Sequence, residues 1–64
     1  MTRHLLALAT WQPIPYIASD LGIPEQTIRT WIRRDKVKTW RLHGYLLAQR
    51  SDVDRMTQAR VLAE

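Results

Sequence analysis

The residues with the most evident chemical capability in this 64-residue chain are the cations between positions 29 and 41. They are Arg29, Arg33, Arg34, Lys36, Lys38 and Arg41, and only Asp35 opposes them, which gives this segment a net charge of +5. The whole chain carries +4, because residues 1–28 sum to −1 and residues 42–64 sum to zero. A basic patch as concentrated as this is typical of a protein that binds a polyanion such as nucleic acid. The alternative is a solvated basic face without a ligand.

Side chains that catalyse reactions or hold metals are present, but their spacing does not assemble a site. His4 and His43 have no partner at the spacing of metal ligands, and the chain contains no cysteine. Asp52 and Asp54 are two residues apart on an expected helix and therefore do not share a face. Ser51 is explained more simply as a helix cap than as a nucleophile. We therefore predict a protein that is not an enzyme and that has no metal and no cofactor.

The basic patch begins on an expected helix that runs from Pro24 or Glu25 to Arg34 or Asp35. At about 100° per residue, its residues divide between two sides. One side has Ile28, Trp31 and Ile32, followed by Asp35; the other has Gln26, Thr27, Arg29, Thr30, Arg33 and Arg34. We expect the apolar side to anchor the helix in the core while hydrogen-bond donors face outward.

A shorter helix should precede the basic one, from Pro13 or Pro15 to Leu21. Proline is tolerated in the first turn of a helix, because the N–H that it lacks would be unpaired there. Gly22 is expected to end the helix with a positive φ. The buried residues of this shorter helix should be Ile14, Ile17, Ala18 and Leu21. Residues 3–10 are apolar but too few for periodicity to decide between strand and helix.

A β-hairpin is expected after the basic helix, from Val37–Leu42 and Tyr45–Ala48 around His43 and Gly44. Two central residues that end in glycine suit a tight turn. Alternation along the first strand puts Trp40 and Leu42 on the same side, which we expect to be the apolar, core side.

A final helix should run from Ser51 to about Ala63. Ser51 is a suitable N-cap, and the helix dipole favours Asp52 and Asp54 in the first turn. We expect its inner side to consist of Val53, Met56, Arg60 and Val61.

The length of the chain predicts a single domain, residues 1–64, with a small core. The apolar run Leu5–Ala9 is shorter than the roughly 7–15 residues of a signal peptide core. No stretch approaches the roughly 20 apolar residues of a membrane span. We therefore expect a cytoplasmic protein that does not interact with a membrane.

The expected elements follow the order of a winged helix-turn-helix: a helix, a glycine turn, a basic helix, a two-stranded hairpin and a final helix. The residues that fill its places are Ala18, Gly22-Ile23, Ile28 to Arg34, Trp40-Arg41-Leu42, Gly44-Tyr45 and Ser51-Asp52-Val53. Over residues 13 to about 56, the chain resembles the small MerR-like domains that include phage excisionases. The resemblance implies a mostly α-helical domain with a small β-hairpin. The chain departs from that pattern at Pro13 and Pro24, where hydroxyl caps are usual, and at Asp35 and His43, where glycine is common.

Helix-turn-helix docking on duplex DNA assigns roles to the polar residues. The uncharged ones near the start of the basic helix would meet base edges in the major groove. Its arginines would take phosphates or guanine, and the loop and hairpin would follow the adjacent backbone or minor groove. The predicted DNA-binding residues are Gln26, Thr27, Arg29, Thr30, Arg33, Arg34, Lys36, Lys38, Arg41, His43 and Arg50.

Resemblance to excisionases further implies a recombination directionality factor, which binds cooperatively near a phage attachment site, bends DNA and directs an integrase toward excision. Its partners would be double-stranded DNA, an integrase and further copies of the chain bound on DNA. Leu5, Leu6 and Leu8 and the final helix are candidates for contacts between copies. One alternative is a small MerR-like transcriptional regulator or repressor. Another is a protein-interaction adaptor, which would tolerate neutralisation of Arg33 and Arg34.

Overall fold

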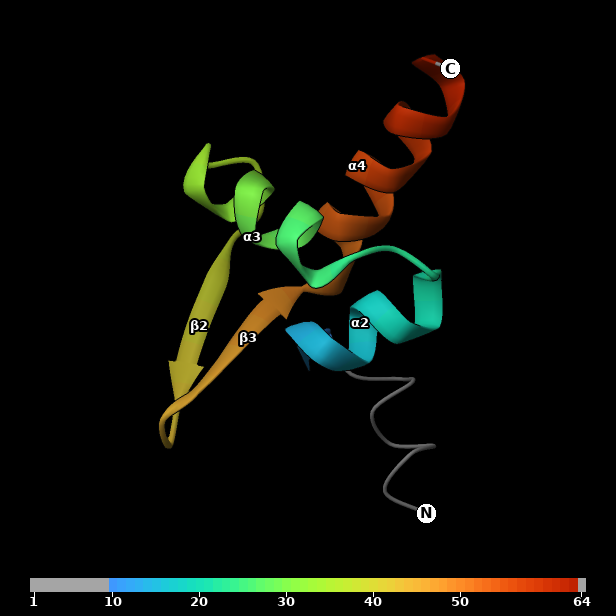
Figure 1. Cartoon of the computed structure of the whole chain (residues 1–64). Coiled ribbons are helices and arrows are strands. Elements are labelled where there is room, and N and C mark those ends of the chain that lie inside the picture. The colour runs from blue at the N-terminus through green and yellow to red at the C-terminus, as the bar shows by residue number, and fades with distance from the viewer. Residues whose placement is uncertain (1–9, 64) are drawn as a thin grey trace.

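Over residues 10–63, the chain forms three helices and a three-stranded antiparallel sheet, and this part is mostly helical (Figure 1). The computed structural model describes residues 10–63, so the question of strand or helix before Thr10 falls outside the described residues. The element order is β1 (Trp11–Pro13), α2 (Ile14–Leu21), α3 (Glu25–Arg33), β2 (Thr39–Leu42), β3 (Tyr45–Gln49) and α4 (Arg50–Ala63). Within residues 10–63, no helix has both the length and the apolar character needed to cross a membrane.

The two proline-led helices form where the sequence predicts them. Pro13 and Pro24 are the N-cap residues of α2 and α3, and both have extended backbone, with φ of −61° and −66°. Neither helix has a side-chain cap, because proline has no polar side chain to supply one. Gly22 ends α2 in the left-handed conformation at φ 66°, and the next N–H, of Ile23, donates to the carbonyl of Ala18 at 3.0 Å. This pairing closes the helix end and turns the chain into α3.

The same kind of ending recurs after α3, with aspartate in place of glycine. Asp35 has φ 61°, and the N–H of Lys36 donates to the carbonyl of Trp31 at 2.9 Å. Asp35 therefore adopts a left-handed conformation, which suits the glycine common at this position and which aspartate tolerates better than most residues do.

The sheet has one strand more than the expected hairpin. The hairpin is present, with Leu42 opposite Tyr45 and Trp40 opposite Leu47. His43 and Gly44 both have positive φ, 50° and 81°, as a type I′ turn requires. Strand β1 pairs with the other edge of β3, which gives the order β1-β3-β2. The sequence did not reveal β1, because it has three residues and ends at a proline, too short a run for alternation to be visible.

The core lies between the helices and one face of the sheet. It is formed by the buried side chains of Ile14, Ile17, Ala18, Ile28, Trp31, Val37, Ala48 and Val53, with Leu21, Ile23, Ile32, Leu46 and Met56 packed against them. The expected anchors of α3, Ile28 and Trp31, are thus confirmed as buried. A polar residue, Gln12 of β1, is also buried, at 1% exposure.

The prediction that Trp40 and Leu42 belong to the core is wrong. They do share a face of β2, but the side chains at these positions are 51% and 41% exposed. The core-facing positions of the sheet belong to Gln12, Leu46 and Ala48, and strand pairing places Trp40 and Leu42 on the opposite face. The error arose because alternation identifies two faces without identifying which one the helices cover.

Helix α4 differs from expectation at its start and in the exposure of its second half. It begins at Arg50, so Ser51 lies inside its first turn and is not the N-cap. Val53 is buried and Met56 packs against the core as predicted, but Arg60 and Val61 are exposed. The reason is geometric: the second half of α4 extends beyond the rest of the domain, where no element faces it (Figure 1).

Candidate nucleic-acid interface

The outer side of α3 carries a continuous polar stripe. Gln26, Arg29, Thr30 and Arg33 follow the spacing i, i+3, i+4 and i+7, which aligns them on one face of a helix. That face points away from the buried pair Ile28 and Trp31. Burial of the apolar side therefore fixes the stripe toward solvent over the length of the helix.

A hydrogen bond within the stripe decides which of its polar groups are available to a ligand. The hydroxyl of Thr30 donates to the backbone carbonyl of Gln26 at 2.9 Å, so in this state its oxygen is left to accept. The side chain of Gln26 is exposed at the first turn and has both a donor and an acceptor. Gln26 is accordingly the better candidate for reading a base edge, and Thr27, half-buried at the margin of the stripe, is a weaker one.

Arg29 makes a loose ion pair with Glu25, at 3.6 Å between a guanidinium nitrogen and a carboxylate oxygen. Both side chains are about half exposed, at 50% and 47%. An ion pair of this kind is worth little in water and exchanges readily for a stronger acceptor such as phosphate. The pair therefore orients Arg29 without withdrawing it from a ligand.

The remaining cations continue from the end of α3 into the loop and the hairpin. No ion pair within residues 10–63 engages Arg33, Arg34, Lys36, Lys38 or Arg41. All five residues are exposed. Asp35, also exposed, is the one acid among them. A polyanion that contacts this segment would meet almost no competing carboxylate.

Arg41 lies on the same side of the sheet as the helices. It pairs with Leu46, which packs on the core, whereas its neighbours Trp40 and Leu42 lie on the other face. Arg41 is nevertheless exposed, because the hairpin extends past the helices (Figure 1). His43, at the turn, is exposed as well. The hairpin thus presents Arg41 on the side from which α3 also projects.

The loop that carries the lysines is fastened to α4 by Asp52. One carboxylate oxygen of Asp52 accepts a hydrogen bond from the backbone N–H of Lys38 at 3.0 Å, and the other accepts from Arg55 at 2.9 Å. Asp52 is buried, and the hydrogen bond from Lys38 lowers the pKa of its carboxyl, with Arg55 adding to the effect against the cost of burial. The sequence suggested only a helix-dipole role for Asp52, and its contact with Lys38, fourteen positions away, was missed.

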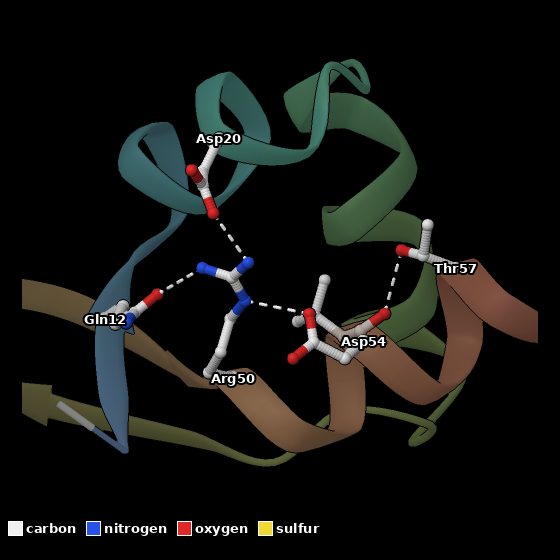
Figure 2. A network of polar contacts seen from close by, with 6 residues as sticks. Gln12, Asp20, Arg50, Asp54 and Thr57 are labelled. Carbon is white, nitrogen blue, oxygen red and sulfur yellow. Dashed lines mark hydrogen bonds and ion pairs between the residues drawn. The ribbon is translucent and has the colours of Figure 1, made fainter. Parts of the chain in front are cut away.

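Arg50, predicted as a phosphate contact, is instead the centre of a polar network inside the domain (Figure 2). Its guanidinium donates to Gln12 of β1 at 2.9 Å, to Asp20 of α2 at 2.6 Å and to Asp54 of α4 at 2.8 Å. Burial alone would lower the pKa of Arg50, but the hydrogen bonds to Asp54 and Asp20 outweigh it and raise the pKa. The spacing of Arg50 and Asp54 could have indicated one of these contacts from the sequence. We leave Arg50 out of the interface, because each of its three guanidinium nitrogens already donates to a partner and its side chain is only 20% exposed.

Groups of three or more His, Cys, Asp or Glu side chains that could hold a metal ion do not occur in residues 10–63. No protein-family model, curated protein or solved structure matches the chain. The function must therefore be argued from the residues themselves.

Proposed function

We propose that the protein is a winged helix-turn-helix that binds double-stranded DNA in a sequence-specific manner, with α3 in the major groove and the β2–β3 hairpin against the adjacent backbone. The observation that carries this proposal is the outward polar stripe of α3. On this face Gln26, an uncharged side chain that can hydrogen-bond to a base edge, lies beside Arg29 and Arg33. A helix of this width fits the major groove, and such side chains bind base edges and phosphates there.

The charge distribution supports the same orientation. Six cations of residues 29–41 lie on α3, the following loop and the hairpin, while Arg50 and Arg55 are paired with acids. A DNA-binding surface therefore needs no rearrangement of the fold to become available.

The role that we propose for this binding is that of an excisionase, on the strength of the resemblance in residues 13 to about 56. The protein would bind beside a phage attachment site and favour assembly of the excisive complex with an integrase. Transcriptional regulation through the same surface is the second candidate, since it would use the same contacts with DNA.

Binding to duplex DNA is tested by its salt dependence. If five of the six cations neutralise phosphates, the logarithm of affinity should fall with the logarithm of salt concentration at a slope of about −4 to −5. Arg33→Ala should reduce the slope by about one. Arg60→Ala is the matched control, because it removes the same charge from the far part of α4, and it should leave the slope unchanged. A slope near zero for the unaltered protein would refute DNA binding.

Excision and regulation are separated by a recombination assay. Purified protein added to an integrase and its attachment sites should raise excision if the excisionase role is correct. Binding near an attachment site without any change in excision would favour the regulator.

A further inference from the structure

The sheet has two edges, and one of them is open to a further strand. Strand β1 lies at one edge and β2 at the other, with β3 between them. Among residues 10–63, no strand or helix lies beyond β2 on its outer side (Figure 1). All four residues of β2, Thr39–Leu42, are exposed. Unpaired backbone groups along such an edge can hydrogen-bond with another extended chain.

Strand pairing shows which backbone groups of β2 point outward. The N–H of Gln49 donates to the carbonyl of Lys38 at 3.0 Å, so the backbone of Lys38 faces β3. Antiparallel strands alternate between residues that hydrogen-bond with the partner strand and residues that do not. Thr39 and Arg41 therefore have their N–H and C=O groups on the side away from β3. Each of these two residues offers a donor and an acceptor to a neighbouring strand.

The opposite edge of the sheet is closed by proline. The N–H of Arg50 donates to the carbonyl of Thr10 at 2.9 Å, so the same alternation gives Trp11 and Pro13 the outward positions of β1. Pro13 has no N–H to offer, and proline on an edge strand prevents further pairing. Strand β2 contains no proline. Of the two edges, the edge at β2 is therefore the one that can accept a strand.

A strand added beside β2 would meet different chemistry on its two faces. The face away from the core has the exposed side chains of Trp40 and Leu42, and the other face has Thr39 and Arg41. Next to Leu42 lies an open groove of about 310 Å³, lined by Pro13, Leu42, His43, Tyr45 and Leu47. Neighbouring side chains on paired strands stabilise the pairing when both are apolar or when their charges are opposite. A strand that suits both faces therefore alternates apolar and acidic residues.

We propose that β2 binds an extended segment of a partner protein in which apolar and acidic residues alternate, and that this segment forms a fourth strand of the sheet. Its backbone hydrogen-bonds with Thr39 and Arg41. Its apolar side chains lie beside Trp40 and Leu42, and its acidic side chains face Arg41. Because Arg41 also belongs to the proposed DNA-binding surface, the partner strand and DNA would compete for it.

Charge favours this partner over a second copy of the chain. Lys38 and Arg41 are exposed, and no carboxylate within residues 10–63 forms an ion pair with them, so an acidic strand would be attracted. Two copies of β2 paired edge to edge would instead bring their Arg41 side chains to neighbouring positions on one face, where like charges destabilise the pairing. Leu5, Leu6 and Leu8, also expected to contact other copies, lie outside the described residues.

The experiment titrates the protein with a short fluorescent peptide of alternating valine and glutamate, in the absence of DNA. A control peptide has the same composition with its valines and glutamates in two blocks, so it keeps the charge but cannot place its apolar side chains on one face. The control should bind about tenfold more weakly.

A variant of β2 tests the backbone pairing. Thr39→Pro removes one outward N–H without changing the charge or the hydrogen bonds with β3. It should weaken binding of the alternating peptide about tenfold, because an acceptor in the peptide loses its donor. Thr39→Ala keeps the N–H and is the matched control, which should bind the peptide as the unaltered protein does.

Amide hydrogen exchange in the unaltered protein reports the pairing directly. Without peptide, the N–H groups of Thr39 and Arg41 should exchange faster than those of Trp40 and Leu42, and the alternating peptide should slow them. No binding of the alternating peptide, equal binding of the block peptide, or unchanged exchange at Thr39 and Arg41 would overturn the proposal. Protection that grows with protein concentration alone would also overturn it, because a second copy would then be the occupant.

Discussion

Arg29 and Arg50 are both arginines with acidic neighbours, and their surroundings give them opposite roles. Arg29 has one partner at 3.6 Å with both side chains half exposed, so water already screens the pair. Arg50 has three partners at 2.6–2.9 Å, on three different elements. A ligand anion can replace Glu25 as the partner of Arg29. To bind Arg50, it would have to break hydrogen bonds that join three elements of the fold.

The loose pair at Arg29 leads to a prediction. Glu25→Gln removes the competing carboxylate and its repulsion of phosphate, so affinity for duplex DNA should rise about two- to fivefold, equivalent to about 0.4–1 kcal/mol. The measurement is a fluorescence anisotropy titration at low salt. Glu64→Gln removes the same charge outside the basic segment and should have a smaller effect. Weaker binding by Glu25→Gln would mean that Glu25 holds Arg29 in its binding position.

Gln26 gives the second prediction, which concerns specificity. Gln26→Ala should reduce the preference for a cognate site over random duplex, because it removes a donor and an acceptor that face outward without removing charge. Arg41→Ala should weaken binding to both sequences about equally, since a phosphate contact carries no base information. Competition titrations with the two duplexes make the comparison. Equal losses from Gln26→Ala on both would contradict placement of α3 in the major groove.

At the scale of elements, α3 depends on Trp31 for its attachment to the core. Trp31→Ala should destabilise the domain by about 3–5 kcal/mol, the usual cost of truncating a buried aromatic side chain, and a domain of this size has little more stability than that. Trp40→Ala is the matched control, because the same truncation on an exposed side chain should cost less than half as much. Circular dichroism during urea unfolding measures both. A folded Trp31→Ala protein that lost only DNA affinity would contradict the burial of Trp31.

The loop between α3 and β2 depends on Asp52, which makes its position sensitive to acid. The folded protein holds the pKa of Asp52 below its ordinary value of 3.8, so this stabilisation is complete above that value and is lost as the pH falls through the lower, folded pKa. Asp52→Ala should cost about 1–3 kcal/mol at neutral pH, because the N–H of Lys38 loses its acceptor.

The acid dependence provides the check on Asp52. Urea unfolding at neutral pH and again well below pH 3.8 should show a smaller loss of stability on acidification in Asp52→Ala than in the unaltered protein. An identical acid response in Asp52→Ala and the unaltered protein would show that Asp52 contributes nothing to it.

At the scale of the whole molecule, the proposed recognition helix α3 and the single hairpin would cover only a short stretch of duplex. We therefore expect several copies to bind adjacent sites cooperatively and to share a bend, whose elastic cost is about 1–6 kcal/mol for a site of roughly 20–30 bp. The exposed end of α4, with Val61 at 62% and Leu62 at 76%, is available for contacts between copies. A mobility-shift titration with the site permuted along the fragment tests this. One shifted species with position-independent mobility would count against cooperative bending and against the excisionase role.

The sequence alone was sufficient for features that depend on local chemistry. The starts of α2 and α3, the left-handed turn at Gly22 and the hairpin at His43 and Gly44 follow from the conformational preferences of individual residues. The outward stripe of α3 follows from helical periodicity, since buried Ile28 and Trp31 fix its opposite side.

The tertiary structure alone decided the features that join distant parts of the chain. Only the packing of the helices against the sheet decides that the face with Ala48 is covered, which leaves Trp40 exposed. The role of Arg50 depends on Asp20, thirty positions away, and that of Asp52 on Lys38. Local preference carries no information about such contacts, because they exist only once packing has brought the elements together.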